Sequence, residues 1–476
     1  MALRSVVGSS RRIRGAGMGI VAAIVVTAAY SWAWSGAPAF DGDSPSYLEM
    51  ARDFADGRID RPHLRAPGYP LFLTASGEVD EPGARLVATQ VFLHCLCVAL
   101  WLVLLRASRA SRWACAMFVL VALSPPFVEH ARFVLSEALA EVAVSAALAG
   151  IALFVLRGGR GWLLLSAAGV GGAGIVHPVH QLLWLLLPAL LGLFRFASRG
   201  RLPSSRQVLA SAILLAVAAL GLFGTVMLRN QQRFGFASIS PMLGATLSHK
   251  TSRVVELLPD DPAGVREILI RHRDAALLDP ESQHLGHSYI FRALRELREA
   301  TGLDAPGLDR ELVRMNLELI RRAPMDYVDE VLRSQVWFWS PGVTDVAGFG
   351  SGVLKAAWNG LRSVVLVGFW GALLLLTGPA LLYLAAPSDR LRPDPGARPL
   401  LETLLVCFLC VGTVFYTAAV SCALTAAVYR LRIPVDLAIL AVVVLAPGLW
   451  GMLAAQLVGN RQASARLGEI PPPMTG

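Results

Sequence analysis

Long apolar runs separated by short polar segments dominate this sequence. A helix that crosses a bilayer needs roughly 17–25 predominantly apolar residues. The pattern therefore predicts an all-α polytopic membrane protein with about ten transmembrane helices. The fifth and sixth runs abut at His177-Pro178, which is either a tight outer turn or a break within one long helix. The runs fall at residues 17–35, 84–105, 112–128, 133–156, 161–176, 178–196, 207–228, 362–385, 400–419 and 434–457.

Arginines mark alternate gaps between these runs. Cytoplasmic loops of membrane proteins carry an excess of Lys and Arg, so we expect both termini and every even-numbered gap on the cytoplasmic side of a plasma (inner) membrane. The odd-numbered gaps hold mostly acids, His and Pro, which places residues 36–83 and 229–361 outside. The arginines in question are Arg4, Arg11, Arg12, Arg14, Arg106, Arg109, Arg112, Arg157, Arg160, Arg195, Arg199, Arg201, Arg206, Arg390, Arg392, Arg398, Arg461 and Arg466.

Four regions follow from this arrangement. An N-terminal transmembrane module covers residues 1–228 and includes the first outer loop, 36–83. Residues 229–361 contain apolar residues at helical spacing, as in "RELVRMNLELIRRAP", and predict a mainly helical extracytoplasmic region. A C-terminal transmembrane module, 362–457, precedes a cytoplasmic tail, 458–476.

Composition supports a membrane protein. The chain is 55% hydrophobic and only 16% charged, against about 25% charged in soluble domains. Its net charge of +9 comes from the loop clusters, and the sequence has no basic face with interleaved aromatic residues, so we expect no nucleic-acid partner. All six cysteines lie in or beside apolar runs, which predicts no disulfide framework. The first run is typical of a retained signal anchor.

The first outer loop opens with "DGDSPSYLEMARDFADG" (41–57). Ser44 is a suitable N-cap and Pro45 suits the first helical position, so we expect a helix that lies in the membrane interface. Asp43 precedes this cap, where the helix dipole favours the ionised carboxylate. Asp43 is therefore either a general base at the rim of a membrane cavity or a residue that only caps and solvates the turn. The expected apolar stripe is Tyr47, Met50, Ala51, Phe54 and Ala55, and the expected water-facing residues are Glu49, Arg52, Asp53 and Asp56.

The same loop continues with "RAPGYPLFLTA" (65–75), which contains Arg65 and Tyr69. Two prolines and a glycine leave backbone groups that need partners or water at membrane depth. The segment therefore either lines a cavity or is a plain connector.

Acids and histidines gather where the third run ends and the fourth begins, in "PPFVEHARFVLSEALAE" (125–141). Charged residues at the mouth of a span are costly and tend to mark functional positions. Glu129 and His130 are candidate ligands of a divalent metal ion, or members of an interfacial salt-bridge cluster. Glu137 and Glu141, four residues apart, share one helix face. His177 and His180 either bind a metal or face interfacial water.

Two arginines, Arg430 and Arg432 in "AVYRLRIPVD", precede the last run on the outer side, against the charge bias of the other loops. Arginine binds phosphate through paired hydrogen bonds. The partner is either a phospholipid headgroup or a lipid-phosphate substrate.

Taken in order, four segments resemble the C-type superfamily of integral membrane glycosyltransferases, and most nearly its bacterial branch related to protein O-mannosyltransferases and lipid A aminoarabinose transferases. The segments are "DGDSPSYLEMARDFADG" with "RAPGYPLFL", "RFVLSEAL", "LRNQQRFGFASISPMLGATL" and "YRLRIPVDLAILAVVVLA". They cover much of the transmembrane frame from residue 18 to about 455. The chain departs from the family at His177-Pro178, where relatives often have Arg-Pro.

The resemblance implies transfer of a sugar from a polyprenyl-phosphate donor to an extracytoplasmic acceptor, with inversion of configuration. It assigns Asp43, four residues before Tyr47, as the base that deprotonates the acceptor hydroxyl. It implies that Arg430 and Arg432 stabilise the phosphate leaving group, and that Glu137 orients a sugar hydroxyl or Arg132. The expected substrate-binding residues are Tyr47, Arg65, Tyr69, Arg132, Glu137, Arg430 and Arg432. A divalent cation is the one cofactor left open.

Two other classes of protein have similar hydropathy. A transporter or flippase of lipid-linked sugars would have inverted repeats and paired broken helices near the midplane, and the sequence contains no such symmetry. A surface-polysaccharide polymerase or ligase would also have many spans and a large outer loop, but would lack the Asp-x-x-x-Tyr of the first loop. The identities of the sugar and the acceptor stay open.

Overall fold

The computed structural model describes residues 37–58, 60–259, 264–278, 289–342, 352–385, 398–425 and 428–468. The described chain is helical, and its single β feature is an isolated bridge between Ala39 and Phe133. The predicted all-α class is therefore confirmed over these residues. The first predicted span, 17–35, lies outside them.

Seven helices are long and apolar enough to cross a membrane, or eight if a bent pair counts as one span. The chain is thus a multi-span membrane protein, although the described helices do not reach the predicted ten. The fifth predicted run forms a helix of only 17 residues, α8 (Arg160–Val176). The seven long elements are α4 (Ala84–Ala107), α7 (Glu137–Arg157), η2 (Pro178–His180) continuing into α9 (Leu183–Ala197), α10 (Ser205–Ala219) continuing into α11 (Thr225–Phe234), α17 (Gly352–Ala385), α18 (Arg398–Leu424) and α19 (Ile433–Gly468).

The third predicted run is not a straight span. It forms α5 (Arg112–Ala122), then a short α6 (Pro125–Val128) and the 3₁₀ turn η1 (Glu129–Arg132), with a bend of 66°. Pro125 and Pro126 stand at the break, and proline lacks the N–H that would continue the helix. The bend carries η1 to the residues that precede α2, where Ala39 exchanges backbone hydrogen bonds with Arg132 and Val134.

Helix α7 occupies the centre of the bundle, with apolar residues around most of its circumference. It packs closely on α8, because a Cβ atom on Gly150 would lie 2.7 Å from the backbone nitrogen of Ser166. Small residues allow such close approach of helices in membranes. Glu137 and Glu141 are buried on this central helix.

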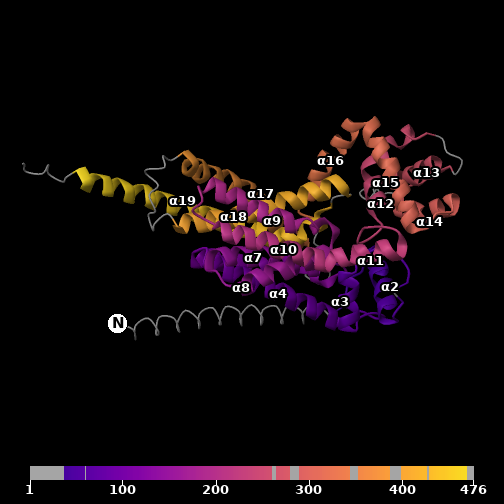
Figure 1. The fold of residues 1–476 in the computed structure, drawn as a ribbon, viewed down its shortest axis with the longest axis horizontal. Coiled ribbons are helices and arrows are strands. Elements are labelled where there is room, and N and C mark those ends of the chain that lie inside the picture. The colour runs from indigo at the N-terminus through magenta and orange to yellow at the C-terminus, as the bar shows by residue number, and fades with distance from the viewer. Residues whose placement is uncertain are drawn as a thin grey trace, which may run out of the picture.

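The two polar regions lie at the same end of the bundle (Figure 1). One comprises α2 (Ser44–Ala55) and α3 (Gly68–Ser76); the other comprises α12 (Leu243–Thr251), η4 (Ser252–Leu257), α13 (Val265–Leu278), α14 (Tyr289–Thr301), α15 (Ala305–Arg322) and α16 (Pro324–Phe338). An ion pair of 2.9 Å joins Asp60, which follows α2, to Arg233 near the end of α11. The second region has its own apolar core, which includes Leu269, Ile290 and Leu312. Its predicted helical character is confirmed over the described residues.

Helix α2 differs from the prediction in two respects. It begins at Ser44, so Asp43 takes the N-cap position, yet the Asp43 side chain makes no capping hydrogen bond. Asp53, predicted to face water, is buried. The chain after α2 folds back over Asp53, which accepts hydrogen bonds from Arg58 and Arg61.

The apolar stripe of α2 is narrower than predicted. Tyr47, Met50 and Ala51 are buried, whereas Phe54 is half-buried and Ala55 is exposed. Tyr47 and Ala51 pack in one cluster with Tyr69 and other residues of α3 and α4. This packing, together with the cationic partners of Asp53, holds the first outer loop in place beside the bundle.

Candidate functional site

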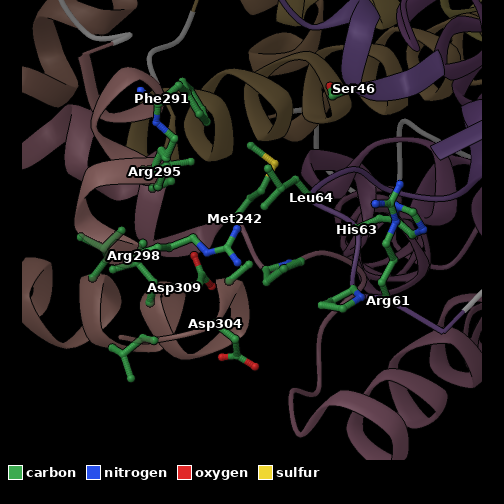
Figure 2. A pocket seen from close by; sticks show the side chains of 18 of the residues that line it. Ser46, Arg61, His63, Leu64, Met242, Phe291, Arg295, Arg298, Asp304 and Asp309 are labelled. Carbon is green, nitrogen blue, oxygen red and sulfur yellow. The ribbon is translucent and has the colours of Figure 1, made fainter. Parts of the chain in front are cut away.

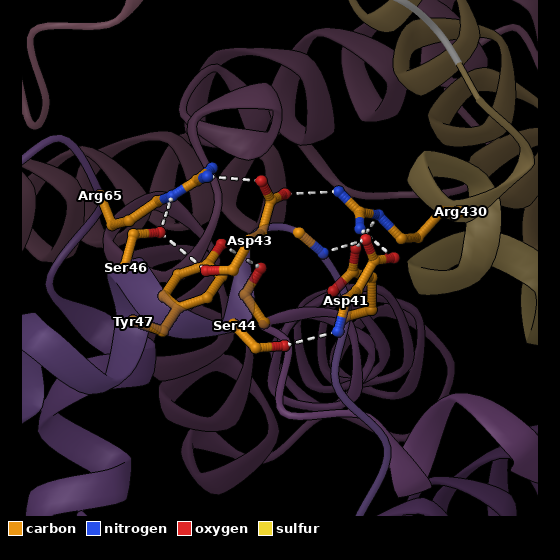
Figure 3. A network of polar contacts seen from close by, with 10 residues as sticks. Asp41, Asp43, Ser44, Ser46, Tyr47, Arg65 and Arg430 are labelled. Carbon is orange, nitrogen blue, oxygen red and sulfur yellow. Dashed lines mark hydrogen bonds and ion pairs between the residues drawn. The ribbon is translucent and has the colours of Figure 1, made fainter. Parts of the chain in front are cut away.

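Asp43 lies between two arginines from opposite ends of the sequence (Figure 3). Arg65 donates from Nη2 to Asp43 Oδ1 at 2.5 Å, and Arg430 donates from Nη2 to Oδ2 at 2.6 Å. Both oxygens of the carboxylate therefore face a guanidinium group. The side chain of Asp43 is 26% exposed and that of Arg430 is 23% exposed, so a substrate can reach both from outside.

Arg430 makes contact with three carboxylates at once. Besides Asp43, its Nη1 donates to Asp41 at 2.9 Å and its Nε lies 2.8 Å from Glu137 Oε1. Asp41 is half-exposed, whereas Glu137 is buried at the start of α7. The site thus brings the first outer loop, α7 and η6 (Tyr429–Arg432) together around one cation.

The charge of Asp43 follows from these contacts. Burial raises the pKa of its carboxyl, but the guanidinium groups of Arg65 and Arg430 outweigh burial and hold the pKa below its ordinary value. Asp43 is therefore ionised across the neutral range. The other oxygen of Glu137, Oε2, is buried and receives no hydrogen bond from any residue that the structure describes.

A tyrosine pair supports the loop that carries Asp43. The rings of Tyr47 and Tyr69 meet edge to face with centroids 5.2 Å apart, and Arg65 lies over the Tyr47 ring. Tyr47 donates to Ser136 Oγ at 3.0 Å, and Tyr69 donates to the amide oxygen of Gln90 at 3.1 Å. Burial raises the pKa of both phenols, so both are neutral donors. The predicted substrate-binding role of Tyr47 and Tyr69 stays a prediction.

The remaining predicted substrate-binding residues take other positions. Arg132 is half-buried in η1, and its backbone carbonyl accepts from Ala39 N at 2.9 Å. Arg432 is fully buried and is not brought to Asp43. It pairs with Asp436 at 2.8 Å and donates to the carbonyl oxygens of Phe338 and Ser340. Arg432 thus fixes η6 to the end of α16.

The side chains of the predicted metal ligands Glu129 and His130 point in different directions and have different partners. His130 Nε2 faces Glu141 Oε2 at 3.0 Å, together with His94 from α4. Glu129 instead interacts electrostatically with Arg362 and the Tyr429 phenol. Adjacent residues on a 3₁₀ turn differ by about 120° in direction, which accounts for the divergence.

The structure adds residues to the site that sequence reasoning did not place there. Ser46 accepts from Arg65 Nε at 2.7 Å and donates to the carbonyl oxygen of Asp43. Burial of His177 and the positive charges of Arg430 and Arg65 lower the pKa of its imidazole to about 4. The ring is therefore neutral near pH 7. Two sequence signals marked this position: the departure from Arg-Pro to His177-Pro178, and the spacing of His177 and His180. Asp41 carried no separate signal beyond its membership of the first acidic stretch.

A cavity of about 1190 Å³ lies between the predicted first outer loop and the predicted second outer region, which comprises α12 to α16. Ser46, His63 and Leu64 line it from one side, and Met242 and Phe291 from the other (Figure 2). Ser46, one of its lining residues, also accepts a hydrogen bond from Arg65, the partner of Asp43. Its walls combine apolar side chains with charged groups of both signs, including Arg61, Glu49, Arg295, Arg298, Glu299, Asp304 and Asp309.

Three comparisons with known proteins were informative to different degrees. No protein-family model matches the chain, and no curated protein does. Among solved structures, the fold is similar to that of ArnT from Cupriavidus metallidurans bound to undecaprenyl phosphate, with 13% identity over 91% of this chain and 78% of that chain and a TM-score of 0.37. At this distance the likeness assigns no residue role or activity to the chain.

Proposed function

We propose that the protein is a membrane glycosyltransferase that moves a sugar from a polyprenyl-phosphate donor to an extracytoplasmic acceptor. The observation that carries the proposal is the Asp43 carboxylate, held ionised between Arg65 and Arg430 at the end of an apolar helical bundle. A base beside a cation is the pair of groups that displacement of a phosphate by a hydroxyl requires. The bundle supplies a surface for the lipid chain.

In the proposed reaction, the hydroxyl oxygen of the acceptor attacks the anomeric carbon of the donor sugar. A carboxylate oxygen of Asp43 accepts the proton of this hydroxyl group as the new bond forms. The bond between the anomeric carbon and the phosphate oxygen breaks, and the polyprenyl phosphate leaves with the electron pair. Attack opposite the leaving group inverts the configuration at the anomeric carbon. The products are the glycosylated acceptor, the lipid phosphate and a protonated Asp43, which then loses its proton to water.

Arg430 is the proposed partner of the donor phosphate. Its guanidinium group carries five N–H donors in a planar arrangement that matches phosphate oxygens. In the free protein these donors face Asp41, Asp43 and Glu137. A bound phosphate would share Arg430 with these carboxylates and weaken its hold on Asp43, so that donor binding strengthens the base. Arg432, engaged with Asp436, would hold the turn rather than the phosphate.

The remaining features supply binding for the two sugars. The unpaired Oε2 of Glu137 suits a hydroxyl of the donor sugar. The cavity that Ser46 lines suits the acceptor, because Ser46 contacts Arg65, the partner of Asp43, and the cavity extends along α12, α14 and α15. Its mixed walls fit an acceptor with both apolar and polar parts, whether lipid, glycan or protein.

The proposed topology has ten spans, formed by the described helices, the bent pair, the short α8 and the segment at 17–35. The arginine-rich gaps would face the cytoplasm together with both termini. Residues 36–83 and 229–361 would then lie outside an inner membrane. The common end of both polar regions in the structure supports this arrangement (Figure 1).

The proposal is tested with purified protein in detergent and a panel of polyprenyl-phosphate sugars. We expect time-dependent release of polyprenyl phosphate, measured by mass spectrometry, in the presence of extracts of cell-envelope lipids and glycans. Envelope glycans and glycoproteins of cells with and without the gene identify the sugar and the acceptor. Accumulation of intact lipid-linked sugar on one side of proteoliposomes, without its consumption, would instead establish a flippase.

Arg65 provides a test through pH dependence. An Arg65→Met variant loses one of the two cations that lower the pKa of Asp43, so the pKa rises because the effect of burial is less fully offset. The acid limb of kcat/KM is expected to move to higher pH, since the ionised base is lost sooner as pH falls. Rates of sugar transfer across the acid range measure this limb.

Two companion variants complete this test. Arg65→Lys keeps the charge and is expected to move the acid limb less. Arg65→Met combined with His177→Gln removes a nearby histidine whose pKa Arg65 also lowers. The double variant therefore shows whether a shift of the acid limb comes from Asp43 and not from His177. An acid limb that stays in place in Arg65→Met would contradict the role of Arg65 at Asp43.

A further inference from the structure

Three ionisable side chains from three elements converge one helical turn from the Asp43 site. His94 of α4, His130 of η1 and Glu141 of α7 are all buried, and one ligand atom of each lies within 4.8 Å of the other two. His94 Nδ1 and His130 Nε2 approach the same oxygen, Glu141 Oε2, at 2.8 and 3.0 Å. Glu141 follows Glu137 by one turn of α7, so the cluster lies directly beyond the carboxylate that contacts Arg430.

The second nitrogen of His94 fixes the state of its ring. Nε2 lies 2.9 Å from the carbonyl oxygen of Ala122, which can only accept, so Nε2 carries a hydrogen. In the neutral ring, Nδ1 then directs a lone pair at Glu141 Oε2. These two atoms attract each other only when a proton or a metal ion lies between them. A second nitrogen that donates to a backbone carbonyl is the usual arrangement of a metal-bound histidine.

We propose that His94, His130 and Glu141 bind a divalent transition-metal ion, for which zinc is the best match. Two imidazoles and one carboxylate form a common zinc ligand set, whereas magnesium and calcium select oxygen ligands. Zinc bonds of about 2.0–2.2 Å place neighbouring ligand atoms roughly 3.3 Å apart. The two histidine–glutamate separations would therefore open by only a few tenths of an ångström. The ion also offsets the cost of burying the Glu141 carboxylate.

The ion has a positioning role in this arrangement. It ties α4, η1 and α7 together at one point. His130 precedes the segment that pairs with Ala39. Glu141 lies one turn after Glu137 on the same face of α7. The ion thus holds the base of the Asp43 loop and the Glu137 side chain without contact with the reacting atoms.

The experiment uses the full chain in detergent, purified without metal-affinity resin. The protein is stripped with a chelator, reloaded with zinc or cobalt, separated from free metal by gel filtration and analysed by mass spectrometry for metal content. We expect about one ion per chain, as for a single three-ligand site, with visible ligand-field bands for cobalt and a higher melting temperature after reloading. His94→Gln and Glu141→Gln are expected to lose these signals, and His272→Gln, which removes a histidine paired with Glu296 on the surface, to keep them.

The wild-type protein alone decides the outcome if the variants fail to fold. No cobalt bands and no retained zinc in the reloaded wild-type chain would overturn the proposal, and would leave a network of shared protons between the three side chains. Metal retained equally by wild type and by a His94→Gln, His130→Gln double variant would overturn it as well. The readout is metal content, so the result is independent of whether the protein transfers sugar.

Discussion

Replacement of Asp43 by asparagine is expected to reduce sugar transfer by about 10²–10⁴-fold, the range that general base catalysis contributes. Asparagine has nearly the same shape and can still accept a hydrogen bond from an arginine, but its amide cannot take the proton of an acceptor hydroxyl. The chain should still fold, because Arg430 keeps Asp41 and Glu137 and Arg65 keeps Ser46. Initial rates with a saturating polyprenyl-phosphate sugar measure the loss.

A matched control separates loss of the base from loss of a loop charge. Asp56→Asn removes a carboxylate from the end of the same helix, where Asp56 is 55% exposed and pairs with Arg58 on the surface. Such pairs contribute little to stability, so this variant is expected to keep wild-type turnover. Melting temperatures of both variants show whether either has unfolded. Full activity of the Asp43→Asn variant would remove Asp43 as the base.

The spanning helices could be predicted because the bilayer imposes a strong constraint. Every backbone group at membrane depth must be bonded within the helix, so long apolar runs and their boundaries are visible in sequence. The break at Pro125 and Pro126 carried its own signal, since two consecutive prolines cannot continue a helix, but the run was still apolar throughout. Hydropathy alone therefore gave a straight span where the structure has a bend of 66°.

The contact between Asp43 and Arg430 joins residues 387 positions apart. Local periodicity contains no information about such a pair, and only the resemblance to a family placed both at one site. The same resemblance grouped Arg432 with Arg430. The structure separates them because residues two apart on a 3₁₀ turn differ by about 240° in direction. Arg432 consequently points to Asp436 and the end of α16.

Buried polar contacts in the bundle were harder to predict than the spans. His94 stands alone in "VFLHCLCVAL", and a single histidine in an apolar run was the available signal for a functional position. Asp53 of α2 is predicted to face water from its place on the helix surface. In the structure, the chain after α2 turns back and brings Arg58 and Arg61 to the Asp53 carboxylate. Only the tertiary fold decides whether such nearby charges meet.

Replacement of Arg430 is the second change from which a large effect is expected. Loss of a charged group that stabilises a leaving group costs about 10²–10³-fold in rate, and the KM for the donor should rise with the loss of the phosphate contact. Arg430→Ala also leaves Asp41, Asp43 and Glu137 close together without the cation, and loss of one partner of a buried pair is destabilising. Arg430→Lys therefore accompanies it, because lysine keeps the charge but not the planar set of donors.

The two Arg430 variants distinguish binding from structural support. If Arg430 contacts the phosphate, Arg430→Lys retains part of the rate, Arg430→Ala loses it, and the melting temperature of Arg430→Lys stays near that of the wild type. Arg253→Ala, which breaks a surface pair with Asp329, serves as the control for loss of an arginine in the second outer region. Kinetics of Arg430→Lys and Arg430→Ala that match the wild type with a polyprenyl-phosphate sugar would end the phosphate assignment. A phosphate contact must also change the donor KM of a variant that stays folded. If the rate falls only in a variant with a lowered melting temperature, Arg430 has a structural role and does not contact the phosphate.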